Sequence, residues 1–234
     1  MTTEAASASA LRIPRDTFSS LVTERLRADI VNGVLKPGTQ LSEAELAKNF
    51  GVSRGPVREA LQRLIQEGLL HGQPHRGAVI PVLTDEDVVD IYLARDALES
   101  AAIRAVMAGG AAAAAYEALD EQVTAMEKAE AAGDWEAVGK FDLEFHTALV
   151  AASGSQRLQR MFRTVISETR LCLGVLTVAE ARADLVAEHR TISERLRAGD
   201  TEEALAMLKL HNDDAIVTLT SREDRGDAVR ADGS

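Results

Sequence analysis

The stretch that decides the fold of this chain spans residues 41–77 and reads LSEAELAKNFGVSRGPVREALQRLIQEGLLHGQPHRG. Near its start, Ser42 is followed three positions later by Glu45, which has the form of a capping box at a helix start. This pattern predicts a short helix over about Glu43–Asn49. Gly51 then supplies the backbone freedom that a tight turn needs.

A second helix is predicted directly after this turn. Ser53 can cap it, Pro56 is tolerated in its first turn, and Gly68 marks its end. Between them, apolar residues recur at helical spacing, as expected of one buried face. These residues are Val57, Leu61, Leu64 and Ile65. The stretch therefore predicts a helix, a turn and a helix.

Two arginines lie on the face of the second helix that is opposite the apolar stripe. Arg54 and Arg58 are one turn apart, at the end of the helix where a recognition helix meets base edges. A guanidinium group can bind guanine through two hydrogen bonds or clamp a phosphate, and a good base contact gives roughly 1–3 kcal/mol of discrimination. An arginine pair alone is usually a solvated face, but here it follows a cap and a turn. We therefore expect both arginines to contact DNA.

A short β-hairpin is predicted after the second helix. Leu69–Gln73 and Ala78–Val82 are extended runs, and residues 74–77 between them form a basic, glycine-bearing tip. A tip of this kind suits the minor groove of DNA. The hairpin completes the pattern of a winged helix.

The segment SRGPVREAL at residues 53–61, with Glu67-Gly68-Leu69 and the hairpin, resembles the winged helix of GntR-family transcription regulators over about residues 17–82. The resemblance implies that the recognition helix contacts the operator and that the wing enters the minor groove. Gly55 stands where the family usually has Thr, and Ala44 where many members carry a DNA-contacting Arg, which bears on base preference and affinity. The predicted DNA-binding residues are Ser53, Arg54, Gly55, Arg58, His75, Arg76 and Gly77.

The charge of the chain is unevenly distributed. The 234 residues are 46% hydrophobic and 3% aromatic, which suits one or two globular, mostly helical domains. The net charge of −11 divides into −1 from Glu4, +3 for residues 10–82, with ten basic and seven acidic residues, and −13 for residues 83–234, with sixteen and twenty-nine. Only the first part should therefore touch phosphate, in moderate, salt-sensitive binding that gains from dimerisation.

The single cysteine, Cys172, permits no internal disulfide, and the sequence shows neither a signal peptide nor an apolar run long enough to span a membrane. We therefore expect a cytoplasmic protein with no membrane partner, associated with the nucleoid when DNA-bound. The predicted parts are a disordered arm (1–10), a winged helix (11–82) whose first helix is Thr17–Asn32, an all-α domain (83–222) and a disordered tail (223–234).

The second part reads as an antiparallel bundle of about six amphipathic helices with polar residues on its inward faces. Asp142 and His146 lie one turn apart on a predicted helix over Trp135–Val150. His189 and His211 occupy the inward stripes of the last two helices. Burying a lone imidazole costs about a few kcal/mol and a lone carboxylate far more, so the four side chains are best explained if they converge on something.

A divalent metal ion is the economical explanation for these four residues. Three imidazoles and a carboxylate suit Zn²⁺, Ni²⁺, Fe²⁺ or Mn²⁺, and the ligand types do not choose among these ions. One or two coordination positions would stay open for water or an organic anion. For each histidine alone, a hydrogen-bonded core residue is the ordinary interpretation, whereas the set of four favours a metal.

Arg95 is a further charged residue on an inward stripe, and there it needs an anionic partner. One possibility is an internal acid, namely Asp96, Glu99 or Asp142. The other is a small carboxylate whose second end coordinates the metal. Two further arginines, on the predicted helix over residues 155–177, could line the same pocket. The predicted effector-binding residues are Arg95, Arg163 and Arg170.

The Asp142-to-His146 pair, followed by His189 and His211, and the segment RDALE at residues 95–99 resemble the metal-bearing helical C-terminal domain (FCD type) of FadR-like GntR regulators. The resemblance extends over most of residues 85–220. It implies a homodimeric, metal-containing sensor of an organic acid or related metabolite that represses genes for transport or breakdown. Two-fold symmetry implies an inverted-repeat operator.

Two other functions stay open at this point. Imidazole and carboxylate ligands with an open metal position also describe metal-dependent enzymes. The sequence shows no further inward acid, base or nucleophile beside the proposed ligands, so we predict a regulator and not an enzyme. The third possibility is a DNA-binding regulator in which the metal is purely structural.

Overall fold

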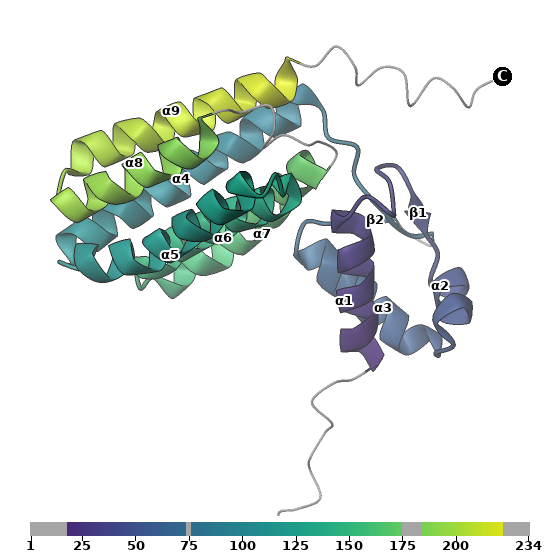
Figure 1. Cartoon of the computed structure of the whole chain (residues 1–234). Helices are drawn as coiled ribbons and strands as arrows, with labels where there is room; N and C mark the ends of the chain where they lie inside the picture. Colours follow the sequence, from purple (N-terminus) through teal and green to yellow (C-terminus); the bar gives the residue numbers. More distant parts are fainter. Residues whose placement is uncertain (1–17, 74–75, 175–183, 222–234) are drawn as a thin grey trace, which may run out of the picture.

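The computed structural model describes residues 18–73, 76–174 and 184–221. Figure 1 shows a small N-terminal part beside an elongated bundle of long helices. The predicted fold class, mostly α with a winged helix-turn-helix followed by a bundle of six helices, is confirmed. The predicted arm at residues 1–10 and tail at residues 223–234 lie outside the described residues.

The N-terminal part is a winged helix. Its described elements are α1 (Phe18–Val31), β1 (Gln40–Leu41), α2 (Glu43–Phe50), α3 (Arg54–Gln66), β2 (His71–Gln73) and β3 (Gly77–Val79). Helices α2 and α3 are the two predicted helices, and Gly51 between them has the positive φ of 66° that the turn requires. Ser42 and Ser53 occupy the N-cap positions, but neither side chain makes a capping hydrogen bond. The predicted capping box at Ser42 is therefore not formed.

The strands form a small antiparallel sheet in the order β1-β3-β2. The two-residue strand β1 was not predicted, because two residues are too few to show alternation. Gly77 begins β3 with a φ of 87°, and a Cβ atom at this position would overlap the backbone oxygen of Leu41. The close approach of β1 and β3 therefore requires glycine at the base of the wing.

The second part is the bundle. Its described helices are α4 (Asp85–Ala108), α5 (Ala112–Ala131), α6 (Trp135–Ala152), α7 (Gln156–Gly174), α8 (Leu185–Ala198) and α9 (Thr201–Thr220). Helix α4 begins with a capping box, in which Asp87 N donates to Thr84 Oγ1 (3.2 Å) and Thr84 N donates to Asp87 Oδ2 (2.8 Å). The sequence predicts breaks at Gly109-Gly110, Gly133-Asp134, residues 153–155 and Gly199-Asp200, and all four fall between these helices. A further predicted break, around Ala179-Glu180, lies outside the described residues.

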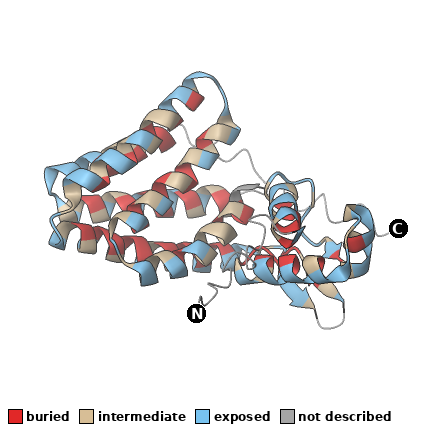
Figure 2. Ribbon diagram, turned by 90° about the horizontal axis from the view of Figure 1, so that it is seen from below, coloured by how far each residue is buried: buried red, intermediate tan, exposed pale blue. Residues whose placement is uncertain are grey.

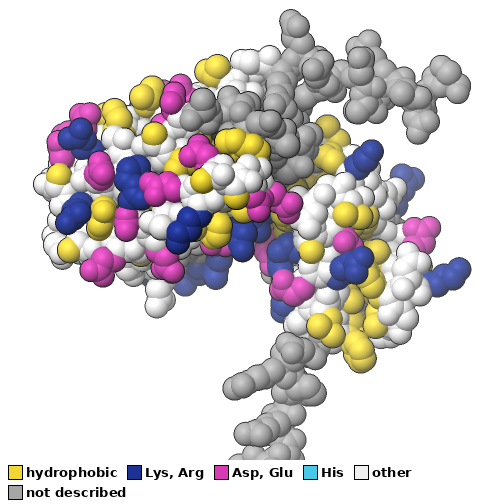
Figure 3. Space-filling view, in the orientation of Figure 1, with side chains coloured by type: hydrophobic (Ala, Val, Ile, Leu, Met, Phe, Trp, Pro, Cys, Tyr) yellow, Lys and Arg dark blue, Asp and Glu magenta, His cyan; other side chains and the backbone are white. Residues whose placement is uncertain are grey.

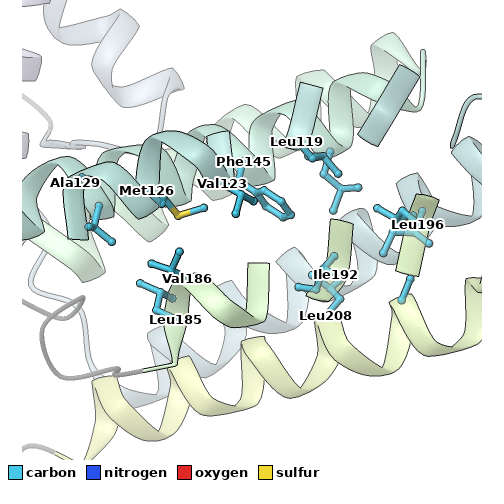
Figure 4. Close-up of a cluster of buried hydrophobic side chains, with 14 residues drawn as sticks. Leu119, Val123, Met126, Ala129, Phe145, Leu185, Val186, Ile192, Leu196 and Leu208 are labelled. Atoms are coloured by element: carbon cyan, nitrogen blue, oxygen red, sulfur yellow. The ribbon is translucent and has the colours of Figure 1, made fainter. Parts of the chain in front are cut away.

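Buried side chains line the inward faces of these helices, while exposed residues cover their outer sides (Figure 2). The largest apolar cluster joins α4, α5, α6, α8 and α9, and Figure 4 shows its side chains meeting between the helices. Among the described residues, no helix combines the length and the hydropathy that crossing a membrane would require.

Helix α7 belongs to both parts of the molecule. It packs against α4 and α6 in the bundle, yet its residue Leu171 lies in the apolar core of the winged helix, with Leu64 and Leu69. One turn earlier, Glu168 lies against Gly68, where an added Cβ atom would come within 2.9 Å of Glu168 Cγ. Helix α7 therefore connects the bundle to the end of the recognition helix α3.

Candidate functional site

The four predicted metal ligands come together inside the bundle. Asp142 and His146 project from α6, His189 from α8 and His211 from α9, and all four side chains are buried. One possible ligand atom from each lies within 4.8 Å of those of the other three. Helical spacing places the first two on one side of α6, and the packing of α8 and α9 adds the other two. The structure thus contains the cluster that the helical period predicted.

The atoms that face the centre of this cluster are the three imidazole Nε2 atoms and one carboxylate oxygen. His146 Nε2 lies 3.1 Å from His211 Nε2 and 3.3 Å from His189 Nε2. Asp142 Oδ1 lies 3.1 Å from His189 Nε2 and 3.9 Å from His146 Nε2. Four atoms that carry lone pairs therefore converge on one point.

The outward Nδ1 atom of each histidine faces an oxygen acceptor. His146 Nδ1 lies 2.5 Å from Glu99 Oε2, and His211 Nδ1 lies 2.8 Å from Glu188 Oε2. His189 Nδ1 lies 2.7 Å from the backbone oxygen of Leu185. Because an ionised carboxylate and a carbonyl can only accept, each Nδ1 must carry a proton and donate it. In a neutral imidazole with its proton on Nδ1, Nε2 carries the lone pair, so each of the three Nε2 atoms has the form that binds a metal.

This arrangement fits a divalent cation. Without one, neutral imidazoles direct their Nε2 lone pairs at one another and at the Asp142 carboxylate with no proton between them. Burial lowers the pKa of His146, which further disfavours an imidazolium at the centre of the cluster. Neighbouring ligand atoms around an ion bound at about 2.0–2.2 Å are roughly 2.8–3.1 Å apart at octahedral angles and roughly 3.3–3.6 Å apart at tetrahedral angles. The three shortest separations in the cluster, 3.1, 3.1 and 3.3 Å, are of this size.

Glu99 joins the cluster to Arg95. Its second oxygen, Oε1, accepts a hydrogen bond of 3.0 Å from Arg95 Nε, and both side chains are buried. Burial raises the pKa of Glu99, but attraction to His146 and Arg95 outweighs burial and the pKa is lowered. Burial lowers the pKa of Arg95, but attraction to Glu99 outweighs it and the pKa is raised. The buried pair is therefore ionised, and of the internal partners that the sequence left open for Arg95, Glu99 is the one hydrogen-bonded to it.

The sequence reasoning missed two residues of the site. Glu99 was considered only as a partner of Arg95, and its contact with His146 was not predicted. Glu188 was not singled out at all, although it directly precedes His189 in the chain. A usable signal was present for Glu99, because it lies one turn beyond Arg95 on the same inward stripe of α4.

Several buried polar atoms on α4 and α9 have no hydrogen-bond partner among the described residues. They are Arg95 Nη2, Asp96 Oδ1 and both side-chain amide atoms of Asn212, which follows His211 in the chain. Buried polar atoms are nearly always satisfied in folded proteins, by protein groups, water or a ligand. These atoms on α4 and α9 are therefore available to ordered water or to a polar ligand.

The other two arginines predicted to bind an effector are less enclosed. Arg163 is exposed on α7. Arg170, which directly precedes Leu171 on α7, is partly buried, and burial lowers its pKa. A role in effector binding stays a prediction for both.

The predicted DNA-reading residues lie on an exposed face of the winged helix. Ser53, Arg54, Gly55 and Arg58 are all exposed at the start of α3. Arg58 is held by Glu43 of α2, with Arg58 Nη2 donating to Glu43 Oε2 at 2.8 Å. Figure 3 shows Lys and Arg side chains projecting from the outer surface of the winged-helix part.

The structure describes only part of the predicted wing tip. Arg76 is exposed, and Gly77 is required by its close approach to β1, whatever it contributes to DNA binding. Gln40 Nε2 donates to the backbone oxygen of Arg76 at 3.3 Å and ties the tip to β1. His75 lies outside the described residues. Contacts of the wing with the minor groove stay a prediction.

Comparison with known proteins identifies both parts of the chain. Residues 18–80 match the family model of bacterial regulatory proteins of the gntR family, and residues 90–214 match that of the FCD domain. These ranges include the winged helix and all four residues of the buried Asp/His cluster. The resemblances noted from the sequence are confirmed.

Individual relatives agree with this assignment. The chain is 34% identical to the uncharacterized HTH-type transcriptional regulator YdhC of Bacillus subtilis, over 80% of this chain and 84% of that protein. It is 31% identical to the probable D-xylose utilization operon transcriptional repressor of Paenarthrobacter nicotinovorans, over 87% and 89%. A crystal structure described as a transcriptional regulator GntR from Rhodococcus sp. RHA1 superposes with a TM-score of 0.73 at 29% identity, covering 87% of this chain and 97% of that one. These relatives are regulators and not enzymes.

Proposed function

Because the chain belongs to the gntR family of bacterial regulatory proteins and carries an FCD domain, we propose that it is a transcriptional repressor controlled by a small carboxylate at a metal site. The observation that carries this proposal is the inward convergence of three Nε2 atoms and Asp142 Oδ1, with each Nδ1 hydrogen-bonded outward. Such a set of ligands and oriented histidines favours a divalent ion, and its ligand types suit Zn²⁺, Ni²⁺, Mn²⁺ and Fe²⁺ alike.

The bound ion would supply a Lewis-acidic position for an anionic oxygen of the effector. Arg95 supports the carboxylate part of the proposal, because its Nη2 is buried and lacks a partner while Nε is engaged by Glu99. The unpartnered amide of Asn212 can donate and accept, which suits a hydroxyl group on the same small molecule. We therefore expect small hydroxycarboxylates to be stronger effectors than simple aliphatic acids.

DNA binding would use α3 and the wing of two chains. A regulator that binds DNA as a two-fold symmetric dimer requires an operator with inverted half-sites. The modest positive charge of residues 10–82 implies that one winged helix alone binds DNA weakly. We propose a homodimer that binds an inverted repeat in the cytoplasm. The relative described as a repressor of a D-xylose utilization operon supports control of catabolic genes.

Helix α7 offers a route between the two sites. Effector binding would reposition the helices around the cluster, and Leu171 and Glu168 of α7 would carry the change to the end of α3. A coupling free energy of about 1–3 kcal/mol, which is a five- to 150-fold change in operator affinity, suffices for a switch.

The test is an operator titration. An operator is first selected from random-sequence duplexes with the metal-loaded wild-type chain, and its affinity is measured with and without a panel of small hydroxycarboxylates. At least one should change the affinity fivefold or more in the wild type and not in His189→Ala, a variant outside the DNA-reading surface. Failure to select any sequence would overturn the DNA-binding half. Equal responses in both proteins would overturn the metal-dependent half.

A purely structural metal is the second candidate, favoured by how completely the cluster is buried. In that case the metal should raise thermal stability, while no carboxylate in the panel changes either melting temperature or operator affinity. A change in the melting temperature or operator affinity of the metal-loaded protein on adding a carboxylate would therefore distinguish a sensor from a regulator with a structural metal.

A further inference from the structure

The guanidinium group of Arg58 is bound from its side by Glu43. Arg58 Nε lies 3.0 Å from Glu43 Oε1 and 3.2 Å from Oε2, and Arg58 Nη2 lies 2.8 Å from Oε2. This is a fork-to-fork pair that uses the Nε and Nη2 edge. It links the first turn of α2 to the first turns of α3, fifteen residues later.

The side-on pairing leaves the far edge of the guanidinium available. An arginine carries five N–H groups, and this pair uses the Nε proton and one Nη2 proton. Both Nη1 protons and the second Nη2 proton are left at the end of the side chain. That end presents the two parallel donors that guanine O6 and N7 accept in the major groove. Glu43 thus holds Arg58 in an orientation suited to base contact.

The pairing with Glu43 affects phosphate binding by Arg58 more than it affects hydrogen bonding to a base. Glu43 neutralises much of the positive charge of Arg58, which weakens its attraction to phosphate but leaves its end-on donors intact. The hydrogen bond from Arg58 lowers the pKa of Glu43, so the carboxylate stays ionised at neutral pH. The pair is also solvent-exposed, with the two side chains 59% and 28% accessible, and exposed ion pairs contribute little to stability. A stabilising role therefore does not explain it.

We propose that Glu43 is a positioning residue for DNA sequence recognition: it orients Arg58 for guanine and limits its non-specific contact with phosphate. The neighbouring Arg54 makes no comparable fork-to-fork pair among the described residues, although its charge is near enough to Glu43 to help lower the pKa of that carboxylate. This inference rests on the proposed DNA-binding function and adds a specificity determinant to it.

The experiment is a double-mutant cycle on DNA binding. Wild type, Glu43→Ala, Arg58→Ala and the double variant are titrated with an operator duplex selected by the wild-type chain and with the same duplex in shuffled sequence. Glu45→Ala is the matched control, because it removes the same charge from an exposed position in the first turn of α2. Glu43→Gln keeps the size of the side chain while removing its charge. Thermal unfolding checks that each variant is folded.

Glu43→Ala should lower the ratio of operator to shuffled-duplex affinity by about three- to tenfold, partly by tightening binding to the shuffled duplex. Glu43→Gln should fall between Glu43→Ala and wild type. Glu45→Ala should leave the ratio within about twofold, and Glu43→Ala should have no further effect on it in the Arg58→Ala background. The preference for guanine should be lost at the same operator position in Glu43→Ala and in Arg58→Ala.

Two results would overturn the proposal while leaving DNA binding intact. One is that Glu43→Ala and Glu45→Ala raise the affinity for the operator and for the shuffled duplex by the same factor. Glu43 would then act only as a negative charge that repels DNA. The other is an undiminished effect of Glu43→Ala when Arg58 is absent. A wild-type chain that selects no operator would instead refute the DNA-binding function itself.

Discussion

Glu99 bridges Arg95 and His146: its Oε1 accepts from Arg95 Nε at 3.0 Å, and its Oε2 lies 2.5 Å from His146 Nδ1. A single buried carboxylate thus holds both a guanidinium predicted to bind the effector and an imidazole predicted to bind the metal. Because both groups are hydrogen-bonded to Glu99, a displacement of Arg95 would shift His146, and the reverse. Effector binding and metal binding are expected to be energetically coupled here.

Replacing Glu99 by Gln should be severely destabilising. The substitution leaves the buried Arg95 charge without its partner, which costs roughly 3–5 kcal/mol in comparable buried pairs. Weaker orientation of His146 should also lower metal affinity by about 10–100-fold. Urea unfolding and metal titration measure the two effects. The control is Glu144→Gln, a more exposed acid on α6, and equal behaviour of the two variants would contradict the bridging role.

Metal removal should lower stability through the same cluster. A ligand that binds only the folded chain stabilises it by about 2.7 kcal/mol at a free concentration of 100 times its Kd. Adding Zn²⁺ to chelator-treated wild-type protein should therefore raise its Tm, whereas His189→Ala should show little or no response. A similar rise in both proteins would place the metal elsewhere.

Two glycines of the winged helix should respond in opposite ways to alanine. Gly77→Ala combines a positive φ with overlap of the Leu41 backbone and should cost roughly 2–5 kcal/mol. Gly55→Ala, in a helical turn with open space around it, should stabilise by about 0.5 kcal/mol. Thermal unfolding of the metal-loaded protein measures both. Tolerance of alanine at Gly77 would argue against the described approach of β3 to β1.

Leu171→Ala should weaken the winged helix although the residue belongs to the bundle. Removing this side chain from the shared core should cost about 2 kcal/mol. Amide hydrogen exchange should report lower protection in α1 and α3, and any operator response to effector should be diminished. Met161→Ala, an exposed position on the same helix, is the control. Unchanged exchange in α1 and α3 would show that α7 does not support the winged helix.

Helical periodicity was sufficient to predict most of the architecture and the four-residue cluster. An inward stripe is set by residue spacing alone, so Asp142, His146, His189 and His211 could be placed on buried faces before any packing was known. The glycines at the turns fixed where the helices end. These features depend on local sequence, which is why they could be predicted.

The features that escaped prediction depend on contacts between distant segments. The two-residue strand β1 is defined only by its pairing with β3, and the contact of Glu99 with His146 joins residues 47 positions apart. The burial of Leu171 in the winged-helix core and the pairing of Glu43 with Arg58 likewise require the relative placement of two helices. The capping box at Ser42 and Glu45 had a suitable sequence, but the Ser42 side chain makes no capping hydrogen bond.

The most direct test of the metal-centred sensor is X-ray absorption spectroscopy at the metal edge of the Zn²⁺-loaded chain. We predict imidazole scattering from about three histidines and a shell of nitrogen and oxygen ligands at roughly 2.0–2.1 Å, lost when His146, His189 and His211 are replaced together. A shell that lacks imidazole scattering, contains sulfur, or persists in the triple variant would contradict the proposed metal centre.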